Sequence, residues 1–453
     1  MKEFEQLTRT IFDLTHQYAI DNLPLNYDTH PSKWKEEDIK QFQIYVHKGF
    51  KQAQELILNE ILGLQVSTKN LNNDLKSCRK KKDTKKAKEI ENEITLVKHK
   101  EVILRSFIDF IAWQFLGGQY YRVRRFYDDR ERSNSRPTLA SSNVQSIIDA
   151  VNYYHAQDES NFALISDLSS FIDIGDILLL QDGQVIPIEL KEGQTNEEVF
   201  QFITKMSKKE ITTCPYSLIS NPSEKFFKQA NRVLNQIKRG NRLTDFLKNE
   251  KGIDPFNEYE VRVNKEEYQV ESYIGVVNNL FKDLEKKDWA YTIFEDVITI
   301  GLYQNTLFNM GDSLLPHLNK SLFGKEFPVV NYLQKLHTPI NEPIYFQGLS
   351  KEHIFDLFFG RIRMLISINL DNFIALCNTN GLNARYLTKK ETMNSKKRHK
   401  NIDLFEWKKQ AIIIDEKLTL GGGIIGRMVF DFTKPSSIIN NFKLQLAEEM
   451  VDT

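Results

Sequence analysis

The stretch IDIGDILLLQDGQVIPIELKEG, residues 172–193, determines how the central part of this 453-residue chain folds. Two apolar runs, 177–180 and 185–190, flank Asp182-Gly183, and Asp-Gly between two such runs is a strong short-range signal for a β-hairpin. Both runs are rich in Ile, Leu and Val without polar alternation, which favours strands that are covered on both faces. We therefore predict two adjacent antiparallel strands in the middle of an α/β sheet.

Three polar side chains stand at the end of this hairpin. Glu189 and Lys191 are two residues apart and project from one face of the second strand, while Asp176 starts the first strand and lies across from them. Two close carboxylates are costly unless their charge is cancelled, and Lys191 cancels only half of it. We therefore expect Mg²⁺ (or Mn²⁺), held by Asp176, Glu189 and the carbonyl of Leu190. Such a site acts on phosphodiesters, with Lys191 orienting or helping to deprotonate the attacking water.

The order Gly175-Asp176, then a hairpin, then Glu189-x-Lys191 resembles the PD-(D/E)xK nuclease superfamily over about residues 140–240. The resemblance implies a restriction-endonuclease-like mixed sheet flanked by helices, with Asp176, Glu189 and Lys191 as catalytic residues. Ile174-Gly175 stands where the name motif has a proline. The wording FALISDLSSFIDIGDILLL followed by IELKEG also resembles a group of uncharacterised bacterial nuclease-like proteins.

The superfamily usually adds an acidic residue from the helix that precedes the first strand. Ser142-Asn143 is expected to cap such a helix, and Asp149 on it is the candidate fourth catalytic acid. The alternative is that Asp149 is only a surface carboxylate. The apolar stripe of this helix consists of Val144, Ile147, Ile148, Val151 and Tyr154.

Two basic segments flank the hairpin and are candidates for contact with nucleic acid. Residues 120–136 interleave arginines with aromatic residues, a mixture that can grip phosphates and stack on bases. A helix is predicted to begin at Pro222-Ser223 and to end at Gly240, with a basic face opposite its apolar stripe. In both segments a solvated charged face is the alternative. The candidate phosphate contacts are Arg124, Arg125, Lys228, Arg232 and Arg239.

Composition limits the classes of protein to which the chain can belong. Equal numbers of basic and acidic residues, 61 each, argue against a wholesale polyanion binder, so nucleic-acid affinity must be local. The three cysteines lack the spacing of a zinc site or disulfide framework, which makes a reducing cytoplasm the default. The longest apolar stretch, residues 102–116, is interrupted by Arg105 and Asp109, so neither membrane insertion nor secretion is expected.

The chain divides into three predicted regions within an α/β (α+β overall) class. Residues 1–116 are expected to be helical or coiled-coil-like, 117–245 to hold the nuclease-like core, and 246–453 to form an α+β accessory domain. Apolar residues from Ala87 onward recur at coiled-coil spacing, over too few heptads to separate an intramolecular helical hairpin from a dimer seam. The lysine-rich stretch 78–88 is interpreted as a solvated helix or turn, with contact to nucleic acid as the alternative.

Two short patterns in the last region lead to further expectations. The run HIFDLFFGRIRMLISI, residues 353–368, is predicted to be helical. Residues 421–426 satisfy Gly-x-Gly-x-x-Gly, but a strand is predicted from Arg427 onward, whereas a dinucleotide site needs a helix there.

The sequence thus predicts a cytoplasmic, Mg²⁺-dependent nuclease that acts on DNA in preference to RNA. By resemblance, it would serve in defence against foreign DNA or in repair. The alternative is a catalytically silent nuclease-fold module that binds nucleic acid or a partner protein within a larger assembly. For either function, the N-terminal helices are the expected place of contact with a second copy of the chain or with a partner subunit.

Overall fold

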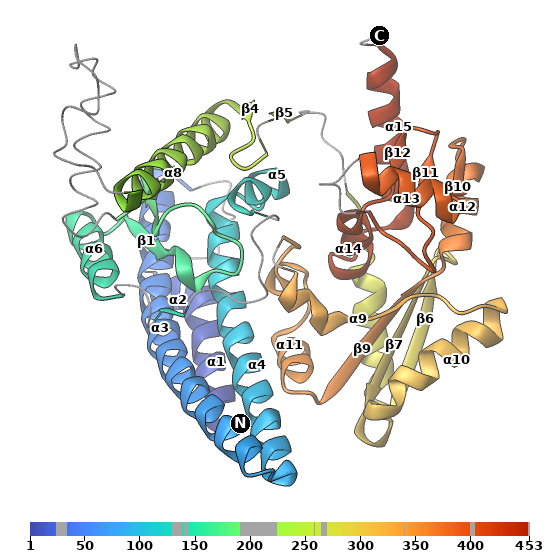
Figure 1. Cartoon of the computed structure of the whole chain (residues 1–453), viewed down its shortest axis with the longest axis horizontal. Coiled ribbons are helices and arrows are strands. Elements are labelled where there is room, and N and C mark those ends of the chain that lie inside the picture. Colours follow the sequence, from blue (N-terminus) through green and yellow to red (C-terminus); the bar gives the residue numbers. More distant parts are fainter. Residues whose placement is uncertain are drawn as a thin grey trace. The chain divides into compact units, whose positions relative to one another are not determined.

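The structure is a computed structural model. It describes residues 1–23, 34–128, 138–139, 144–190, 224–257, 259–263, 270–338, 340–398 and 404–451. The chain divides into two compact units, Met1–Asn264 and Lys265–Thr453. Each unit combines helices with small antiparallel sheets, so the chain as a whole is of the α+β class (Figure 1).

The first unit begins with a helical hairpin. Its helices are α1 (Lys2–His16), α2 (Tyr18–Asn22), α3 (Glu36–Lys80) and α4 (Thr84–Phe115). The α3–α4 turn contains Lys82 at a φ of 55°, and the carboxylate of Asp83 accepts a hydrogen bond at 3.1 Å from the N–H of Lys86, which caps α4. The apolar positions expected for a coiled coil are buried within this single chain, which favours the intramolecular hairpin over a dimer seam. They are Ile90, Ile94, Val97, Leu104, Ile108 and Ile111.

A three-stranded sheet and its helices complete this unit. The elements are α5 (Tyr120–Val123), α6 (Val144–Gln157), β1 (Phe162–Ile165), β2 (Ile177–Gln181), β3 (Gln184–Ile188), α8 (Glu224–Asn249), β4 (Lys251–Ile253) and β5 (Glu260–Arg262). Strands β1, β2 and β3 pair in that order, all antiparallel. Asp182 and Gly183 connect β2 to β3 with φ values of 50° and 72°, as a two-residue type I′ turn requires. The predicted hairpin is therefore confirmed.

The prediction that the hairpin strands are covered on both faces is confirmed for β2 and wrong for β3. Ile177, Leu178 and Leu179 of β2 are buried, whereas the residues of β3 are half-buried or exposed. The reason is position in the sheet, because in the described part of the chain β3 pairs only with β2. A run of Ile and Val identifies a strand but does not tell how many neighbours it has.

The outer edge of β1 is satisfied by side chains from the helices. Gln54 of α3 donates to the carbonyl of Ala163 at 3.0 Å and accepts from the N–H of Ile165 at 2.9 Å. His155 of α6 accepts from the N–H of Ala163 through Nε2 at 3.0 Å. These groups take the place of a neighbouring strand beside Ala163 and Ile165.

Arg105 and Asp109, the two charges that interrupt the apolar stretch of α4, anchor the loop between β1 and β2. Asp109 accepts hydrogen bonds at 2.7 Å from the hydroxyl of Ser169 and from the N–H of Ser170. Arg105 donates to the carbonyl of Asp167 at 2.5 Å.

No helix in the described part of the chain is both long and apolar enough to cross a membrane.

Helix α8 extends beyond the predicted end at Gly240, which is a correction. It runs to Asn249, and Glu250 follows at a φ of 53°. Leu243 and Phe246 continue the buried stripe beyond Gly240. Their packing offsets the cost of a glycine inside a helix, which is about 1 kcal/mol.

The second unit is built around a four-stranded antiparallel sheet in the order β6-β7-β9-β8, with a smaller sheet β10-β11-β12. Its strands are β6 (Trp289–Phe294), β7 (Ile298–Gln304), β8 (Val329–Asn331), β9 (Ile362–Ile368), β10 (Ala384–Tyr386), β11 (Ile412–Ile414) and β12 (Leu418–Thr419). Its α-helices are α9 (Ile274–Leu284), α10 (Gly311–Phe323), α11 (Lys351–Phe358), α12 (Leu370–Thr379), α13 (Lys389–Arg398), α14 (Gly422–Phe430) and α15 (Pro435–Val451).

Two sequence expectations fail in this unit. The helix predicted for residues 353–368 is instead α11 followed by the central strand β9, with Gly360 at a φ of 69° between them. The strand predicted from Arg427 is the second half of α14. Both segments are largely buried, and a short apolar run buried on several sides has no period that separates helix from strand. Because β12 is an antiparallel strand of two residues, Gly421–Gly426 still lacks the parallel βαβ setting of a dinucleotide site.

His155, whose side chain binds the edge of β1, should make the stability of the first unit depend on pH. Burial, with the nearby charges of Lys51 and His47, lowers the pKa of His155 from 6.5 to about 4. The pKa of His155 is lower in the folded state than in the unfolded state. Neutral His155 therefore contributes fully to the free energy of unfolding above about pH 6.5, and this contribution is lost as the pH falls toward 4. His155→Gln keeps an acceptor for Ala163 that does not titrate. We expect it to reduce proton uptake on unfolding by about one proton near pH 5.

Urea unfolding curves of wild type and variant at several pH values between 4.5 and 7 measure this difference. His317→Gln, which changes an exposed histidine of α10 in the second unit, is the control and should leave the unfolding of the first unit as in the wild type. An identical pH dependence in wild type and His155→Gln would contradict the expectation.

Candidate functional site

The open end of the β2–β3 hairpin holds Asp176 and Glu189 together. Each stands one residue beyond the cross-strand pair Ile177 and Ile188. The N–H of Leu190 donates to Asp176 Oδ2 at 2.6 Å, and the N–H of Gly175 donates to Glu189 Oε1 at 3.2 Å. Each carboxylate is therefore held by the backbone of the opposite strand end, and both side chains are half-buried.

Gly175 makes this arrangement sterically possible. Its φ is 80°, and a Cβ at this position would lie 3.1 Å from the backbone nitrogen and 3.2 Å from the carbonyl oxygen of Ile188. The adjacent N–H of Asp176 donates to that same carbonyl at 2.7 Å, and the carbonyl of Asp176 accepts from the N–H of Ser166 at 3.0 Å. The backbone of Asp176 is thus fixed by β3 on one side and by the end of β1 on the other.

Helix α8 supplies a further contact that the sequence did not reveal. Gln236 Nε2 donates to Glu189 Oε2 at 3.1 Å, across a separation of 47 residues. Gln236 borders the apolar stripe of α8, three residues after the buried Val233. The spacing from Val233 is the sequence signal that Gln236 faces the fold, whereas its partner was set by packing alone.

The carboxylate and carbonyl oxygens at the end of the hairpin are the type of ligand that a hard divalent cation prefers. A carboxylate offers about four lone-pair positions, so an oxygen that accepts an N–H can still coordinate a metal. Magnesium needs only one or two carboxylates from the protein, because water and phosphate complete its octahedron. No group of three or more His, Cys, Asp or Glu suited to a metal occurs among the described residues. The ligand set predicted from the sequence is Asp176, Glu189 and the carbonyl of Leu190. Lys191 lies outside the described residues.

Asp149, the candidate fourth acid, has its contact on its own helix. The side chain is exposed on α6, and Gln145 Nε2 donates to its Oδ1 at 2.9 Å. The role of Asp149 as the fourth acid stays a prediction. The cap predicted at Ser142-Asn143 lies outside the described residues.

The arginines of the first basic segment have partners within the fold. Arg125 forms a nearly buried ion pair with Asp254, and burial lowers the pKa of Arg125. Arg124 donates to the carbonyl of Tyr127 at 3.0 Å. In this arrangement Arg125 is a structural residue that joins the segment before the hairpin to the segment after α8. Residues 129–137 of the basic segment lie outside the described part of the chain.

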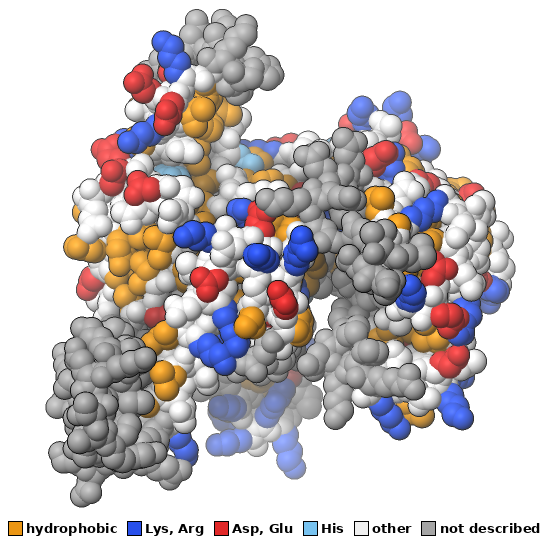
Figure 2. All heavy atoms as spheres, turned by 90° about the horizontal axis from the view of Figure 1, so that it is seen from above, with side chains coloured by type: hydrophobic (Ala, Val, Ile, Leu, Met, Phe, Trp, Pro, Cys, Tyr) orange, Lys and Arg blue, Asp and Glu red, His pale blue; other side chains and the backbone are white. Residues whose placement is uncertain are grey.

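The basic residues of α8 fall into two groups. Arg239 lies 3.5 Å from the buried carboxylate of Asp128, with its guanidinium 5.1 Å from the ring centre of Phe256. Lys228 and Arg232 are exposed. Seen from above, the face that includes α8 carries basic and acidic side chains side by side (Figure 2). Lys228 and Arg232 are therefore the predicted phosphate contacts that best remain accessible.

No protein-family model matches this chain, and no match was found among curated proteins or solved structures. The resemblance to the nuclease superfamily therefore rests on the sequence motif of residues 175–191.

Gly175→Ala tests whether the backbone at this position controls the site. The strained φ and the close approach to Ile188 should reduce the free energy of unfolding by about 1–3 kcal/mol and weaken Mn²⁺ binding. Gly240→Ala is the matched control, because Gly240 lies inside α8 with nothing within 4 Å of an added Cβ. That change should stabilise the protein by about 0.5–1 kcal/mol.

Chemical denaturation and Mn²⁺ titration calorimetry measure both variants. Equal stability and equal metal affinity in Gly175→Ala and wild type would show that the backbone at 175 is not required.

Proposed function

We propose that this protein is a nuclease that uses Mg²⁺ or Mn²⁺ to hydrolyse phosphodiester bonds, with DNA preferred over RNA. The observation that carries the proposal is the reciprocal contact at the end of the hairpin. Asp176 and Glu189 are each bound by the opposite strand end, in a sequence that continues to Lys191. Two half-buried carboxylates, followed in the sequence by a lysine, form a set of groups suited to binding a cation and a phosphate.

Each residue has a distinct role in this proposal. Asp176, Glu189 and the carbonyl of Leu190 hold the cation, and Gln236 keeps the carboxylate of Glu189 oriented. The cation, when bound, polarises the scissile phosphate. Lys191 orients the attacking water and helps to remove its proton. The two N–H donors, from Gly175 and Leu190, hold the carboxylates in place before substrate arrives.

The order of elements supports a restriction-endonuclease-like core. The resemblance implies a helix before the strands and a helix after the signature strand. Helix α6 precedes β1, and α8 is the next described helix after β3, with residues 191–223 between them outside the described part of the chain. On α8, Lys228 and Arg232 are exposed and Gln236 contacts Glu189, so one helix would connect phosphate binding to the site. Defence against foreign DNA, or repair, is the biological setting that the resemblance implies.

Cleavage assays with matched variants test the proposal. Supercoiled plasmid, linear duplex and single-stranded DNA are incubated with Mg²⁺ or Mn²⁺, and with EDTA as the metal-free control. Asp176→Asn, Glu189→Gln and Lys191→Ala should each reduce the cleavage rate by about 100-fold or more, because each removes a charge from the reacting centre. Asp182→Asn should retain full activity, since Asp182 is exposed in the hairpin turn and Asn tolerates its positive φ.

Mn²⁺ titration separates the two candidate functions. A nuclease should lose both Mn²⁺ binding and cutting in Asp176→Asn and Glu189→Gln. A folded wild type that binds DNA but cuts none of the three forms in either metal would instead support the catalytically silent module. Retention of full activity by both carboxylate variants would rule out the proposed site.

A further inference from the structure

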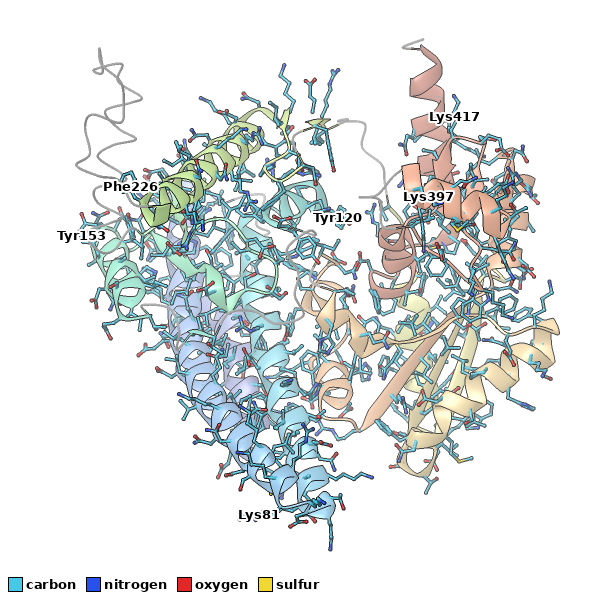
Figure 3. All side chains as sticks on the ribbon, in the orientation of Figure 1. Lys81, Tyr120, Tyr153, Phe226, Lys397 and Lys417 are labelled. Carbon is cyan, nitrogen blue, oxygen red and sulfur yellow. The ribbon has the colours of Figure 1, made fainter. Side chains whose placement is uncertain are left out.

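The turn between α3 and α4 concentrates positive charge in a protein whose net charge is zero. Residues 76–88, here called the basic tip, contain eight basic residues and one acidic residue, so their net charge is 8 − 1 = +7, against −7 for the rest of the chain. Figure 3 labels Lys81 at this end of the helical hairpin, away from Phe226 of α8. The basic residues are Lys76, Arg79, Lys80, Lys81, Lys82, Lys85, Lys86 and Lys88, all exposed.

Most of these charges lack a compensating partner. Arg79 pairs with Glu91 at 2.7 Å, and both side chains are largely exposed. The side chains of the seven lysines have no acidic partner in the described part of the chain. Closely spaced like charges repel one another, which disfavours the folded tip unless an external anion offsets the repulsion.

The position of two lysines on α4 adds to this cost. Lys85 and Lys86 lie in the first turn of α4, which contains no acidic residue of its own, so the carboxylate of the N-cap Asp83 is the one acidic group of the basic tip at this end. The N-terminal end of a helix carries a partial positive charge, so acidic residues stabilise this turn and basic ones destabilise it. An arrangement that is unfavourable for helix stability becomes favourable when an anion binds beside the turn.

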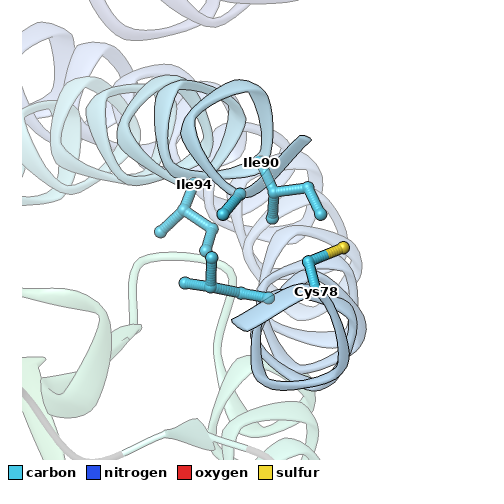
Figure 4. Close-up of a cluster of buried hydrophobic side chains, with 5 residues drawn as sticks. Cys78, Ile90 and Ile94 are labelled. Carbon is cyan, nitrogen blue, oxygen red and sulfur yellow. The ribbon is translucent and has the colours of Figure 1, made fainter. Parts of the chain in front are cut away.

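The apolar side chains at and next to the basic tip are buried between the two helices. Leu75, Cys78, Ala87, Ile90 and Ile94 form a buried cluster between the two helices (Figure 4). Residues 75–94 therefore expose no apolar side chain that could insert into a bilayer or an apolar groove. The cluster holds the turn in place, and charge is what the tip presents to a partner.

We propose that the basic tip binds the phosphate backbone of nucleic acid. Lysine ammonium groups act as point charges without the planar fork of arginine, so the contact would be independent of base sequence. Asp109, which anchors the loop before β2, lies 26 residues along α4 from Asp83, or about 40 Å at 1.5 Å per residue. The tip is thus a second binding surface, separate from the hairpin, and it requires no cleavage.

Binding in EDTA tests the tip without any contribution from catalysis. The full chain is titrated onto fluorescent 40-base-pair duplex DNA and duplex RNA at several salt concentrations. The tip variant replaces Lys80, Lys81, Lys85 and Lys86 with Gln. The control variant replaces Lys282, Lys286, Lys287 and Lys320 with Gln, which are exposed lysines of the second unit and give the same change in net charge.

The tip variant should bind at least about tenfold more weakly at 0.1 M salt. The slope of log K against log salt should fall by up to about 3.6, since each phosphate contact contributes about 0.9. The control variant should change affinity less than about twofold. Circular dichroism confirms that both variants are folded, because exposed lysines contribute nothing to the buried cluster.

Three outcomes would overturn the proposal. Unchanged affinity in the tip variant would leave the charges as a solvated surface, and an equal loss in both variants would indicate net charge alone. Unchanged nucleic-acid affinity with lost binding to phosphatidylserine vesicles would identify a membrane surface. Asp176→Asn should retain the contribution of the tip, so failure of the nuclease proposal and failure of this one are distinguishable.

Discussion

The first unit depends on the polar contacts by which its long helices hold a very small sheet. Strands of four and five residues have too little surface to be stable alone. Gln54 of α3 replaces a missing strand beside β1, and Asp109 of α4 binds the loop that leads into β2. Both helix side chains are buried, and their hydrogen bonds satisfy them. The helical hairpin is therefore the support on which the β-hairpin and its carboxylates are positioned.

The basic residues around the hairpin are of two kinds: some form ion pairs within the fold, and others have exposed side chains. Arg125 and Arg239 pair with Asp254 and Asp128, so they hold α8 and the chain before and after it in place. Removing one member of a nearly buried pair leaves an uncompensated charge, which is why such residues are poor candidates for transient phosphate contacts. Lys228 and Arg232 of α8 and the basic residues of the tip have exposed side chains instead.

In the proposed nuclease the two surfaces would have different roles: the hairpin would bind the metal ion, and the basic tip would bind the phosphate backbone. The hairpin offers a few oxygen ligands with restrained geometry, and the precision of such a site comes from Gly175 and from the contacts to both strand ends. The tip offers many exposed lysines with no fixed geometry, which suits non-specific binding to a regular polyanion. Helix α4 connects them as one continuous element of 32 residues.

By itself, the sequence determined the features that depend on residues a few positions apart. The Asp182-Gly183 turn follows from local φ preferences, and the convergence of Asp176 and Glu189 follows from that turn. The periodic stripes of α4 and α6 also identified these helices. Tertiary structure alone decided the partners of Gln236 and Arg125, 47 and 129 residues away, the continuation of α8 past Gly240, and the identity of β9 and α14. The physical reason is that packing selects the partner of a charge and the conformation of an apolar run, and neither is encoded in a short window.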